Sequence, residues 1–235
     1  MRRVGILGGT FDPIHNGHLD AGRAAQRALD LGEILVVPSN IPPHRPQPVA
    51  SSYHRFAMVA LAIAGRSGWR AIDIELQEIA RSYTSNTLQR FHADGFSAGE
   101  LFFITGADAF VEIATWKDYP SLLDLAHFAV ISRRGISVGA LPERLPALAS
   151  RMRTPSAGAE ALASPAIFLI DEPTADVSST AIRLALAHGR SIVGMVPSVV
   201  QLHIEQHGLY QHVAPAAEAG RGEANPAAGR LHGQE

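Results

Sequence analysis

The chain lacks cysteine altogether, so none of its 235 residues can form a disulfide, act as a thiolate nucleophile or supply a sulfur ligand to zinc. It also lacks an excess of either charge, because 20 basic and 22 acidic residues leave a formal net charge of −2 at pH 7. This balance gives no electrostatic reason to expect a nucleic-acid polymer or an anionic membrane as a partner. The absence of cysteine fits the reducing cytoplasm, where we expect the protein to reside.

Long apolar runs are also missing. The longest, FAMVALAIA (residues 56–64), has about half of the ~20 residues that a membrane-spanning helix needs. The basic start, Met1-Arg2-Arg3, is followed by an apolar stretch that Gly8-Gly9 soon interrupts, so we do not expect a signal peptide. Because 46% of the residues are hydrophobic and 18% are charged, we expect a folded globular protein instead.

Several short segments have the composition of buried parallel strands. They are almost continuously apolar rather than alternating, which is typical of strands covered by helices on both faces. These segments are VGIL (4–7), EILVVP (33–38), LFFIT (101–105), FAVIS (128–132) and IFLID (167–171), with WRAIDIEL (69–76) as a weaker candidate.

Helical patterns lie between these strands, and each of them closes on a glycine that is suited to a helix C-cap. They are GHLDAGRAAQRALDLG (17–32), SSYHRFAMVALAIAG (51–65), SNTLQRFHADG (85–95) and SSTAIRLALAHG (178–189). Alternation of strands and helices predicts an α/β fold with a doubly wound, Rossmann-like parallel sheet. We expect one domain over residues 1–213, with a helix and loops in residues 135–165, and a disordered tail over residues 214–235.

The stretch GGTFDPIHNGHLD (8–20) follows the first strand and leads into a helix. Its glycines let backbone N–H groups approach a ligand, and a helix N-terminus favours anions. It matches neither the dinucleotide-binding nor the P-loop pattern. His15 and His18 could therefore be metal ligands, ordinary loop histidines or donors to a phosphate, and the stretch alone slightly favours ordinary loop histidines.

A second stretch, VSSTAIR (177–183), changes this balance. It follows the last clear strand and opens a helix with hydroxyl side chains, and Arg183 lies one turn beyond Ser179. A serine N-cap with a surface arginine would be the ordinary explanation. However, two separate strand-to-helix junctions suited to anions in one parallel sheet are uncommon by chance, which favours a phosphate-binding site.

These two stretches together resemble the signatures of the nucleotidylyltransferase superfamily, an H-x-G-H loop and a late S-S/T-x-I-R helix start. Further blocks occur in the order typical of bacterial nicotinate-nucleotide adenylyltransferases, and the similarity extends over roughly residues 3–210. The blocks are PSNIPPHR (38–45), ELQEIARSYTSNTL (75–88), ITGADAFVEIATWKDY (104–119), VISRRG (130–135) and MVPSVVQLHIEQHGLY (195–210).

The resemblance implies the nucleotidylyltransferase fold and transfer of the adenylyl group of ATP to nicotinate mononucleotide, which gives deamido-NAD and pyrophosphate. It also implies Mg²⁺ carried with ATP and no metal site of the protein's own. Its matching positions suggest that His15, His18 and Arg183 are catalytic. The ATP site would consist of Gly8, Gly9, Thr10, Phe11, His15, His18, Gly106, Asp108, Ser179, Thr180 and Arg183.

The same resemblance suggests a mononucleotide site in which Trp116 stacks on the pyridine ring. Its other members would be Asn40, His44, Arg45, Ser82, Tyr83, Thr84 and Arg133. Some positions depart from the family pattern: Arg45 replaces a usual lysine, Asn86 an aspartate and His203 a tyrosine. The SRRG run leaves Arg133 and Arg134 as alternatives for contact with the mononucleotide phosphate.

The chemistry of this transfer agrees with the residue types. A phosphate monoester is largely dianionic near pH 7 and needs no general base, so catalysis requires positioning and neutralisation of charge. Three alternatives remain. They are a related adenylyltransferase for nicotinamide mononucleotide or phosphopantetheine, a catalytically silent nucleotide-binding module, and a zinc hydrolase, which lacks a convincing third ligand. A homo-oligomer is compatible with the sequence.

Overall fold

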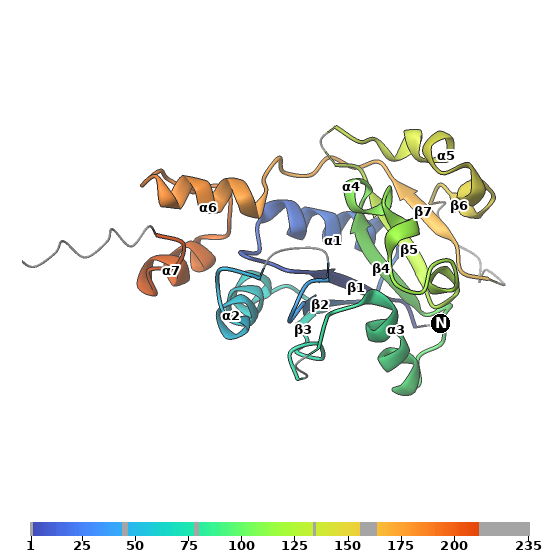
Figure 1. Cartoon of the computed structure of the whole chain (residues 1–235), viewed down its shortest axis with the longest axis horizontal. Helices are drawn as coiled ribbons and strands as arrows, with labels where there is room; N and C mark the ends of the chain where they lie inside the picture. Colours follow the sequence, from blue (N-terminus) through green and yellow to red (C-terminus); the bar gives the residue numbers. More distant parts are fainter. Residues whose placement is uncertain (1, 44–46, 78–79, 134, 156–163, 212–235) are drawn as a thin grey trace, which may run out of the picture.

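The computed structural model describes residues 2–43, 47–77, 80–133, 135–155 and 164–211. Its centre is a seven-stranded sheet in the order β3-β2-β1-β4-β5-β7-β6, in which every pair of neighbouring strands is parallel (Figure 1). The strands are β1 (Val4–Gly9), β2 (Glu33–Pro38), β3 (Trp69–Ala71), β4 (Leu101–Gly106), β5 (His127–Ile131), β6 (Met152–Arg153) and β7 (Ile167–Ile170).

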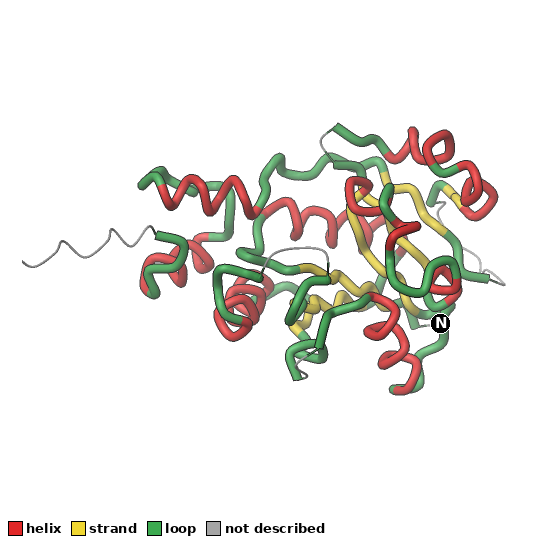
Figure 2. Tube along the Cα trace, in the orientation of Figure 1, coloured by secondary structure: helices red, strands yellow, loops and turns green. Residues whose placement is uncertain are grey.

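Helices connect these strands and cover both faces of the sheet (Figure 2). The α-helices are α1 (Asn16–Leu29), α2 (Ser52–Ile63), α3 (Thr84–Ala93), α4 (Ala107–Phe110), α5 (Leu141–Arg144), α6 (Ser179–Ala187) and α7 (Ser198–Gln206). In the described residues, short 3₁₀ segments at Ile113–Thr115, Ser121–Asp124, Val138–Ala140 and Pro146–Arg151 complete the connections. The predicted doubly wound parallel sheet is therefore confirmed.

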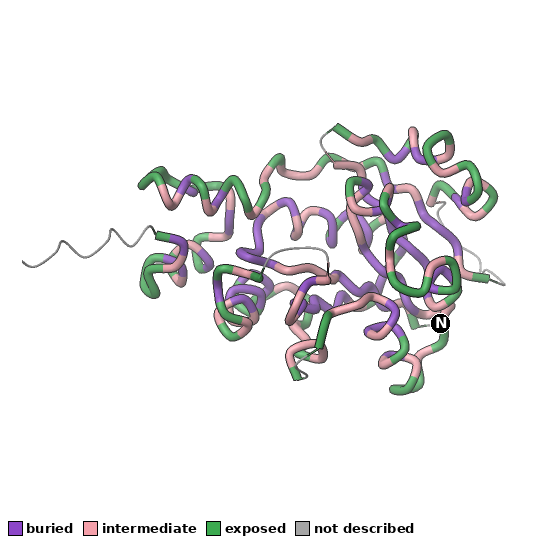
Figure 3. The backbone as a smooth tube through the Cα atoms, viewed as in Figure 1, coloured by how far each residue is buried: buried purple, intermediate pink, exposed green. Residues whose placement is uncertain are grey.

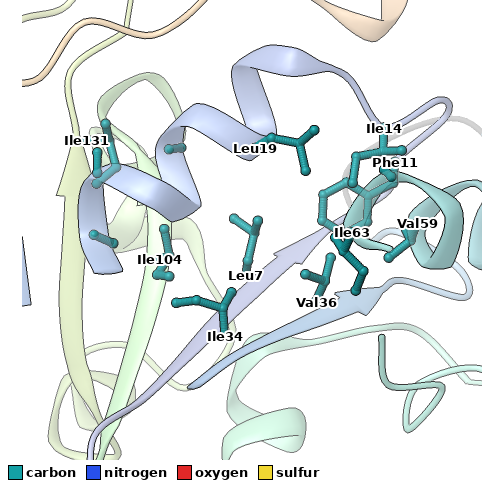
Figure 4. Close-up of a cluster of buried hydrophobic side chains, with 14 of the residues drawn as sticks. Leu7, Phe11, Ile14, Leu19, Ile34, Val36, Val59, Ile63, Ile104 and Ile131 are labelled. Atoms are coloured by element: carbon teal, nitrogen blue, oxygen red, sulfur yellow. The ribbon is translucent and has the colours of Figure 1, made fainter. Parts of the chain in front are cut away.

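The sheet separates two apolar cores. One core packs α1, α2, α6 and α7 against one face, and the close-up in Figure 4 shows Leu7, Ile34 and Ile104 of the strands and Leu19 of α1 among its side chains. The second core packs α3, α4 and α5 against the opposite face. Side chains of a strand alternate between these faces, so β1 sends Leu7 into the first core and Ile6 into the second. Burial is greatest along the central strands (Figure 3).

The strand predictions hold, but only Trp69–Ala71 of the weaker candidate is a strand. The Ala- and Pro-rich segment 135–165 contains two features that its composition did not predict, 3₁₀ segments and the two-residue strand β6. Helix α7 was likewise not expected as a helix from periodicity.

Three of the four predicted glycine caps are confirmed by positive φ angles directly after the helix cap residue, at Gly65, Gly95 and Gly189. The fourth was wrong, because α1 ends at Leu29 and Asp30 takes the left-handed conformation with a φ of 48°. Asparagine and aspartate tolerate this region better than most residues, so Asp30 can end the helix two residues before Gly32.

The topology creates a ligand-binding edge at its centre. From β1 the chain continues to β2 and β3, towards one edge of the sheet. From β4 it continues to β5, β6 and β7, towards the other edge, so the strand order reverses between the neighbours β1 and β4. In open α/β sheets, ligands bind outside the carboxyl ends of the strands at such a switch point. Here these ends are Gly8-Gly9 of β1 and Gly106 of β4.

Some predictions fall outside the described residues. These are His44 and Arg45 of the mononucleotide site, Arg134, and the expected tail over residues 214–235 together with its boundary. Within the part of the chain that the structure describes, no helix combines the length and apolar character needed to cross a membrane.

Candidate active site

The two histidines lie where β1 passes into α1. His15 is the N-cap of α1, and its backbone N–H donates a hydrogen bond to Nδ1 of His18, 3.3 Å away. Their rings stack with centroids 3.6 Å apart, and the ring of Phe11 meets the His18 ring edge-on at 5.0 Å. The three-residue spacing thus brings both imidazoles to one place at the helix N-terminus, as the sequence predicted.

Burial determines the protonation state of the His15 imidazole, because the residue is only 2% exposed. Removal from water, assisted by the nearby positive charge of Arg133, lowers the pKa of His15 to about 3. The imidazole is therefore neutral near pH 7. Its Nδ1 atom is buried and has no hydrogen-bond partner among the described residues. A buried polar nitrogen without a partner is costly, so this atom is suited to a ligand.

Space is limited around the glycines at the ends of β1 and β4. A Cβ atom on Gly9 would lie 2.9 Å from the Phe11 ring, and one on Gly106 would lie 2.3 Å from Oδ1 of Asp108. Gly8 is less confined, with the Phe103 ring 3.2 Å from such an atom. Thr10 follows Gly9 and is half-buried. Phe11 is fully buried despite a positive φ of 49°. The loop backbone is thus held by packing.

The N-terminus of α6 binds directly to this loop. Ser178 caps the helix by accepting a hydrogen bond from the backbone N–H of Ala181 at 3.1 Å. The hydroxyl of Ser179 donates to the carbonyl of Pro13 at 2.9 Å. Arg183 donates through Nη1 to the carbonyl of Asp12 at 2.7 Å and through Nη2 to Oγ1 of Thr180 at 3.4 Å. Two helix N-termini, separated by about 160 residues in sequence, therefore meet at one loop.

The buried carboxylate of Asp12 connects the loop to two other segments of the chain. Its Oδ2 accepts from the backbone N–H of Val49 at 2.8 Å, and its Oδ1 accepts from the N–H of Ala50 at 3.0 Å and from the hydroxyl of Tyr210 at 2.8 Å. Arg183 Nη1 lies 3.8 Å from Asp12 Oδ2. Asp12 is 4% exposed, and both of its carboxylate oxygens accept hydrogen bonds from the protein.

Arg133 and Asp108 meet on the β4 side of the loop. Arg133 Nε lies 3.9 Å from Asp108 Oδ1, and its Nη1 would be 3.0 Å from a Cβ atom placed on Gly17 in α1. The family resemblance suggested that Arg133 contacts the phosphate of the mononucleotide. The structure brings its guanidinium next to the N-terminus of α1 and the predicted ATP residue Asp108.

The remaining predicted mononucleotide residues form a second group at the same edge. The hydroxyl of Ser82 accepts from the backbone N–H of Asn40 at 2.8 Å, which joins the end of β2 to the start of α3. Tyr83 is the N-cap of α3 and Thr84 is its first residue. The ammonium of Lys117, next to Trp116, lies 5.5 Å from the centroid of the Tyr83 ring. Trp116 is half-buried and meets Phe103 edge-on at 6.0 Å.

Sequence reasoning missed a carboxylate beneath this second group. Glu75 lines a small pocket together with Ser82, Tyr83 and Thr87. Its carboxylate accepts a hydrogen bond from Oγ1 of Thr87. Burial raises the pKa of Glu75, although hydrogen bonds from Thr87 and Ser82 partly oppose the shift. The Glu75 carboxylate thus positions the hydroxyls of Ser82 and Thr87 by accepting hydrogen bonds from them.

Arg55 was also missed, and it joins the two groups. The residue is 1% exposed, and its Nη1 donates to the carbonyls of Thr10 at 2.7 Å and Ser39 at 2.6 Å, while its Nη2 donates to the carbonyl of Asn40 at 3.2 Å. Burial lowers the pKa of Arg55, and the charge of Asp12 opposes the shift. A lone arginine within an apolar helix was the available sequence signal.

Comparison with known proteins agrees with this geometry. Residues 6–185 match the model of the cytidylyltransferase-like family. A nicotinate-nucleotide adenylyltransferase of Desulfatibacillum aliphaticivorans, named as probable, is 39% identical over 219 residues, which cover 88% of this chain and 99% of that protein. A protein of the same name from Cronobacter sakazakii is 39% identical, with 87% and 94% covered. The chain belongs to the cytidylyltransferase-like family, among the nicotinate-nucleotide adenylyltransferases.

Solved structures support the fold. The nicotinic acid mononucleotide adenylyltransferase of Plasmodium falciparum, solved with APC, superposes with a TM-score of 0.66 at 19% identity. The alignment covers 89% of this chain and 98% of that one. A second structure of the same protein, solved with NaAD, gives the same TM-score at 18% identity.

Proposed function

We propose that the protein transfers the adenylyl group of ATP to nicotinate mononucleotide and releases pyrophosphate. The observation that carries this proposal is the meeting of α1 and α6 at the loop of residues 8–15, through the bonds of Ser179 to Pro13 and of Arg183 to Asp12. Two helix N-termini with two imidazoles and a guanidinium between them suit a triphosphate. The names of the relatives support the same activity.

The reaction follows from what these groups supply. A phosphate oxygen of the mononucleotide attacks the α-phosphorus of ATP, a new P–O bond forms, and the bond to the β-phosphate oxygen breaks as pyrophosphate leaves. The attacking phosphate is already largely dianionic near pH 7, so no protein group has to remove a proton. Negative charge grows on the leaving pyrophosphate, and preorganised donors there stabilise the transition state.

In this proposal, each group of the site has a role. The backbone at Gly8, Gly9 and Thr10 admits the phosphates closely, and neutral His15 can donate to a phosphate through its unpartnered Nδ1 when the ring carries its proton there. His18 and Arg183 stabilise the charge that develops on the leaving group. Gly106 at the end of β4 and Asp108 in α4 contact the nucleotide, and the buried Phe11 packs against Gly9 of the loop. Thr180 adds a hydroxyl beside Arg183.

Mg²⁺ would accompany ATP rather than occupy a carboxylate cage. The Asp12 oxygens already accept from Val49, Ala50 and Tyr210, and Asp108 lies beside Arg133. Mg²⁺ prefers to keep waters and to bind substrate phosphates, so this donor set fits an ion that arrives on the nucleotide and neutralises part of its charge.

The second group explains why we propose the acid rather than the amide as substrate. The first N–H groups of α3, at Thr84 and Ser85, have no partner in the preceding helical turn because they open the helix. Such donors suit the carboxylate of nicotinate, whereas the amide NH₂ of nicotinamide presents only hydrogens to them. With Trp116 against the ring, the mismatch costs ~3 kcal/mol, or roughly 10²-fold in kcat/KM.

The test is pyrophosphate release from ATP with three acceptors: nicotinate mononucleotide, nicotinamide mononucleotide and phosphopantetheine. We expect a kcat/KM for the acid at least ~10²-fold above that for the amide, and no release with phosphopantetheine. His18→Ala is expected to lower kcat by ~10²–10³-fold, because it removes one donor at a site of developing charge.

Three outcomes would contradict the proposal. Equal rates with acid and amide would indicate a dual-specificity enzyme. Release only with phosphopantetheine would assign another substrate. ATP binding without release for any acceptor would indicate a silent nucleotide-binding module. The matched control is His188→Ala, an exposed histidine at the far end of α6, for which we expect the wild-type rate.

A further inference from the structure

Three histidines gather where α2 packs beside α7, in the left-hand half of the molecule in Figure 1. His54 lies in the first turn of α2, His203 lies in the last turns of α7, and His207 is the C-cap residue of α7. Their ring centroids are 5.3 Å apart for His54 and His203, 4.8 Å for His54 and His207, and 4.4 Å for His203 and His207.

The ligand atoms of these rings converge. One nitrogen from each of the three residues lies within 4.8 Å of the others. Nδ1 of His54 and Nε2 of His203 are 3.2 Å apart. Among the residues that the structure describes, no other trio of histidine or acidic side chains brings its ligand atoms this close.

We propose that His54, His203 and His207 form a binding site for a zinc ion, with water as the fourth ligand. Tetrahedral zinc with Zn–N distances of about 2.0–2.1 Å sets neighbouring nitrogens about 3.3 Å apart, close to the separation of His54 and His203. Small side-chain rotations bring His207 to the same distance. This residue is exposed, so water can reach the remaining position.

The chemistry of the donors selects the metal. Imidazole nitrogen suits zinc and other late transition metals, whereas Mg²⁺ and Ca²⁺ prefer oxygen ligands, which the three residues do not supply. Metal binding also requires neutral imidazole.

A zinc ion here would connect α7 to the site. His54 directly precedes Arg55, which holds the carbonyls of Thr10 and Ser39. His207 lies three residues before Tyr210, whose hydroxyl binds Asp12. Because zinc bridges α2 and α7 only in the folded chain, its binding should stabilise the fold.

The experiment uses the full chain without a polyhistidine tag, freed of metal by a chelator. ZnCl₂ is titrated against a competing fluorescent zinc indicator, and MgCl₂ serves as the comparison. We expect one equivalent of zinc with high affinity and no saturable Mg²⁺ binding at this site. Zinc at about 100 times its Kd should raise Tm by about 5 °C or more. Co²⁺ in place of zinc should give the intense visible absorption of a tetrahedral site.

Matched variants separate this site from other histidines. His203→Gln and His207→Gln should each weaken zinc binding by more than about tenfold, because two histidines leave the coordination incomplete. His188→Gln should bind zinc as the wild type does. The Tm of each variant without metal shows that it is folded. Unchanged zinc affinity in both ligand variants, or no zinc binding by the wild type, would overturn the proposal. Neither result bears on adenylyl transfer, which is measured separately.

Discussion

At the scale of single residues, Arg183 makes the most specific contacts of the proposed phosphate site. Its two terminal nitrogens bind different partners, the carbonyl of Asp12 and the hydroxyl of Thr180. Lysine carries the same charge on one nitrogen and cannot reproduce this fork or a bidentate contact with phosphate. We expect Arg183→Lys to lower kcat/KM by about tenfold or more.

Steady-state pyrophosphate release measures this effect. The control is Arg190→Lys, an exposed arginine shortly after α6, which should leave kcat/KM unchanged. Wild-type kcat/KM in Arg183→Lys would show that only the charge matters, or that Arg183 does not contact the nucleotide.

The sequence predicted the meeting of His15, His18, Ser179 and Arg183 because each lies at a strand-to-helix junction, where chain direction alone brings it to the carboxyl edge. Arg55 and Glu75 could not be found in this way. Their importance comes from burial, and burial of a charged side chain depends on which carbonyls or hydroxyls the rest of the fold places around it. The roles of the individual site residues stay predictions until variants are measured.

At the scale of elements, the segment after α7 is tied to the loop between β1 and α1. Tyr210 is buried, and its hydroxyl donates to Asp12 Oδ1 at 2.8 Å across 198 residues of sequence. Burial and the adjacent Asp12 carboxylate raise the pKa of Tyr210, so the hydroxyl keeps the proton that it donates. The bond is charge-assisted and shielded from water.

We expect Tyr210→Phe to lower the free energy of unfolding by about 2 kcal/mol, because the variant keeps the ring but removes one donor from a buried carboxylate. Urea unfolding measures the change. Tyr53→Phe is the matched control, since Tyr53 is 86% exposed and its hydroxyl should contribute almost nothing. Equal destabilisation by the two variants would contradict the role given to the Tyr210 bond.

Elements were predictable where periodicity was strong and local. Near-continuous apolar runs identified the long strands, but β6 has only two residues and α7 has mixed polarity, so neither produced a clear pattern. The end of α1 shows the same limit, since Asp30 adopts a left-handed conformation that glycine usually takes.

At the scale of the whole molecule, strand order and long-range clusters depend on how distant segments pack. The parallel sheet was predictable from the alternation of strands and helices, but the order of its strands was not. The cluster of His54 and His203 joins residues that are 149 positions apart. No local spacing signals such a pair.

Two buried histidines make the stability of the whole fold depend on pH. His127 begins β5, and its Nδ1 accepts a hydrogen bond from the backbone N–H of Ala166 at 3.0 Å. Burial, with a contribution from Arg3, lowers the pKa of His127 to about 4, and burial lowers that of His15 to about 3. Both side chains are therefore neutral in the folded protein at pH 5, whereas in the unfolded chain a histidine has a pKa of about 6.5.

The unfolded chain thus binds more protons than the folded one between about pH 6.5 and pH 4, so stability falls as the pH is lowered through this window. Above pH 6.5 both states are neutral and the effect vanishes. For each histidine the loss is about 1.4 kcal/mol per pH unit, or about 2 kcal/mol between pH 7 and pH 5. His127→Gln keeps an acceptor for Ala166 but does not titrate. We therefore expect the variant to lose about 2 kcal/mol less than the wild type over this interval.

Urea unfolding of both proteins at pH 7, 6 and 5 measures the difference, with a chelator present so that zinc cannot bind the histidines of α2 and α7. The imidazole resonances of His127 should report a neutral ring at pH 5. Parallel losses of stability in the two proteins would contradict the assignment, as would a protonated His127 at pH 5. Either result would mean that water or a compensating carboxylate reaches the start of β5, and the acid sensitivity of the fold would then have to arise from its carboxylates.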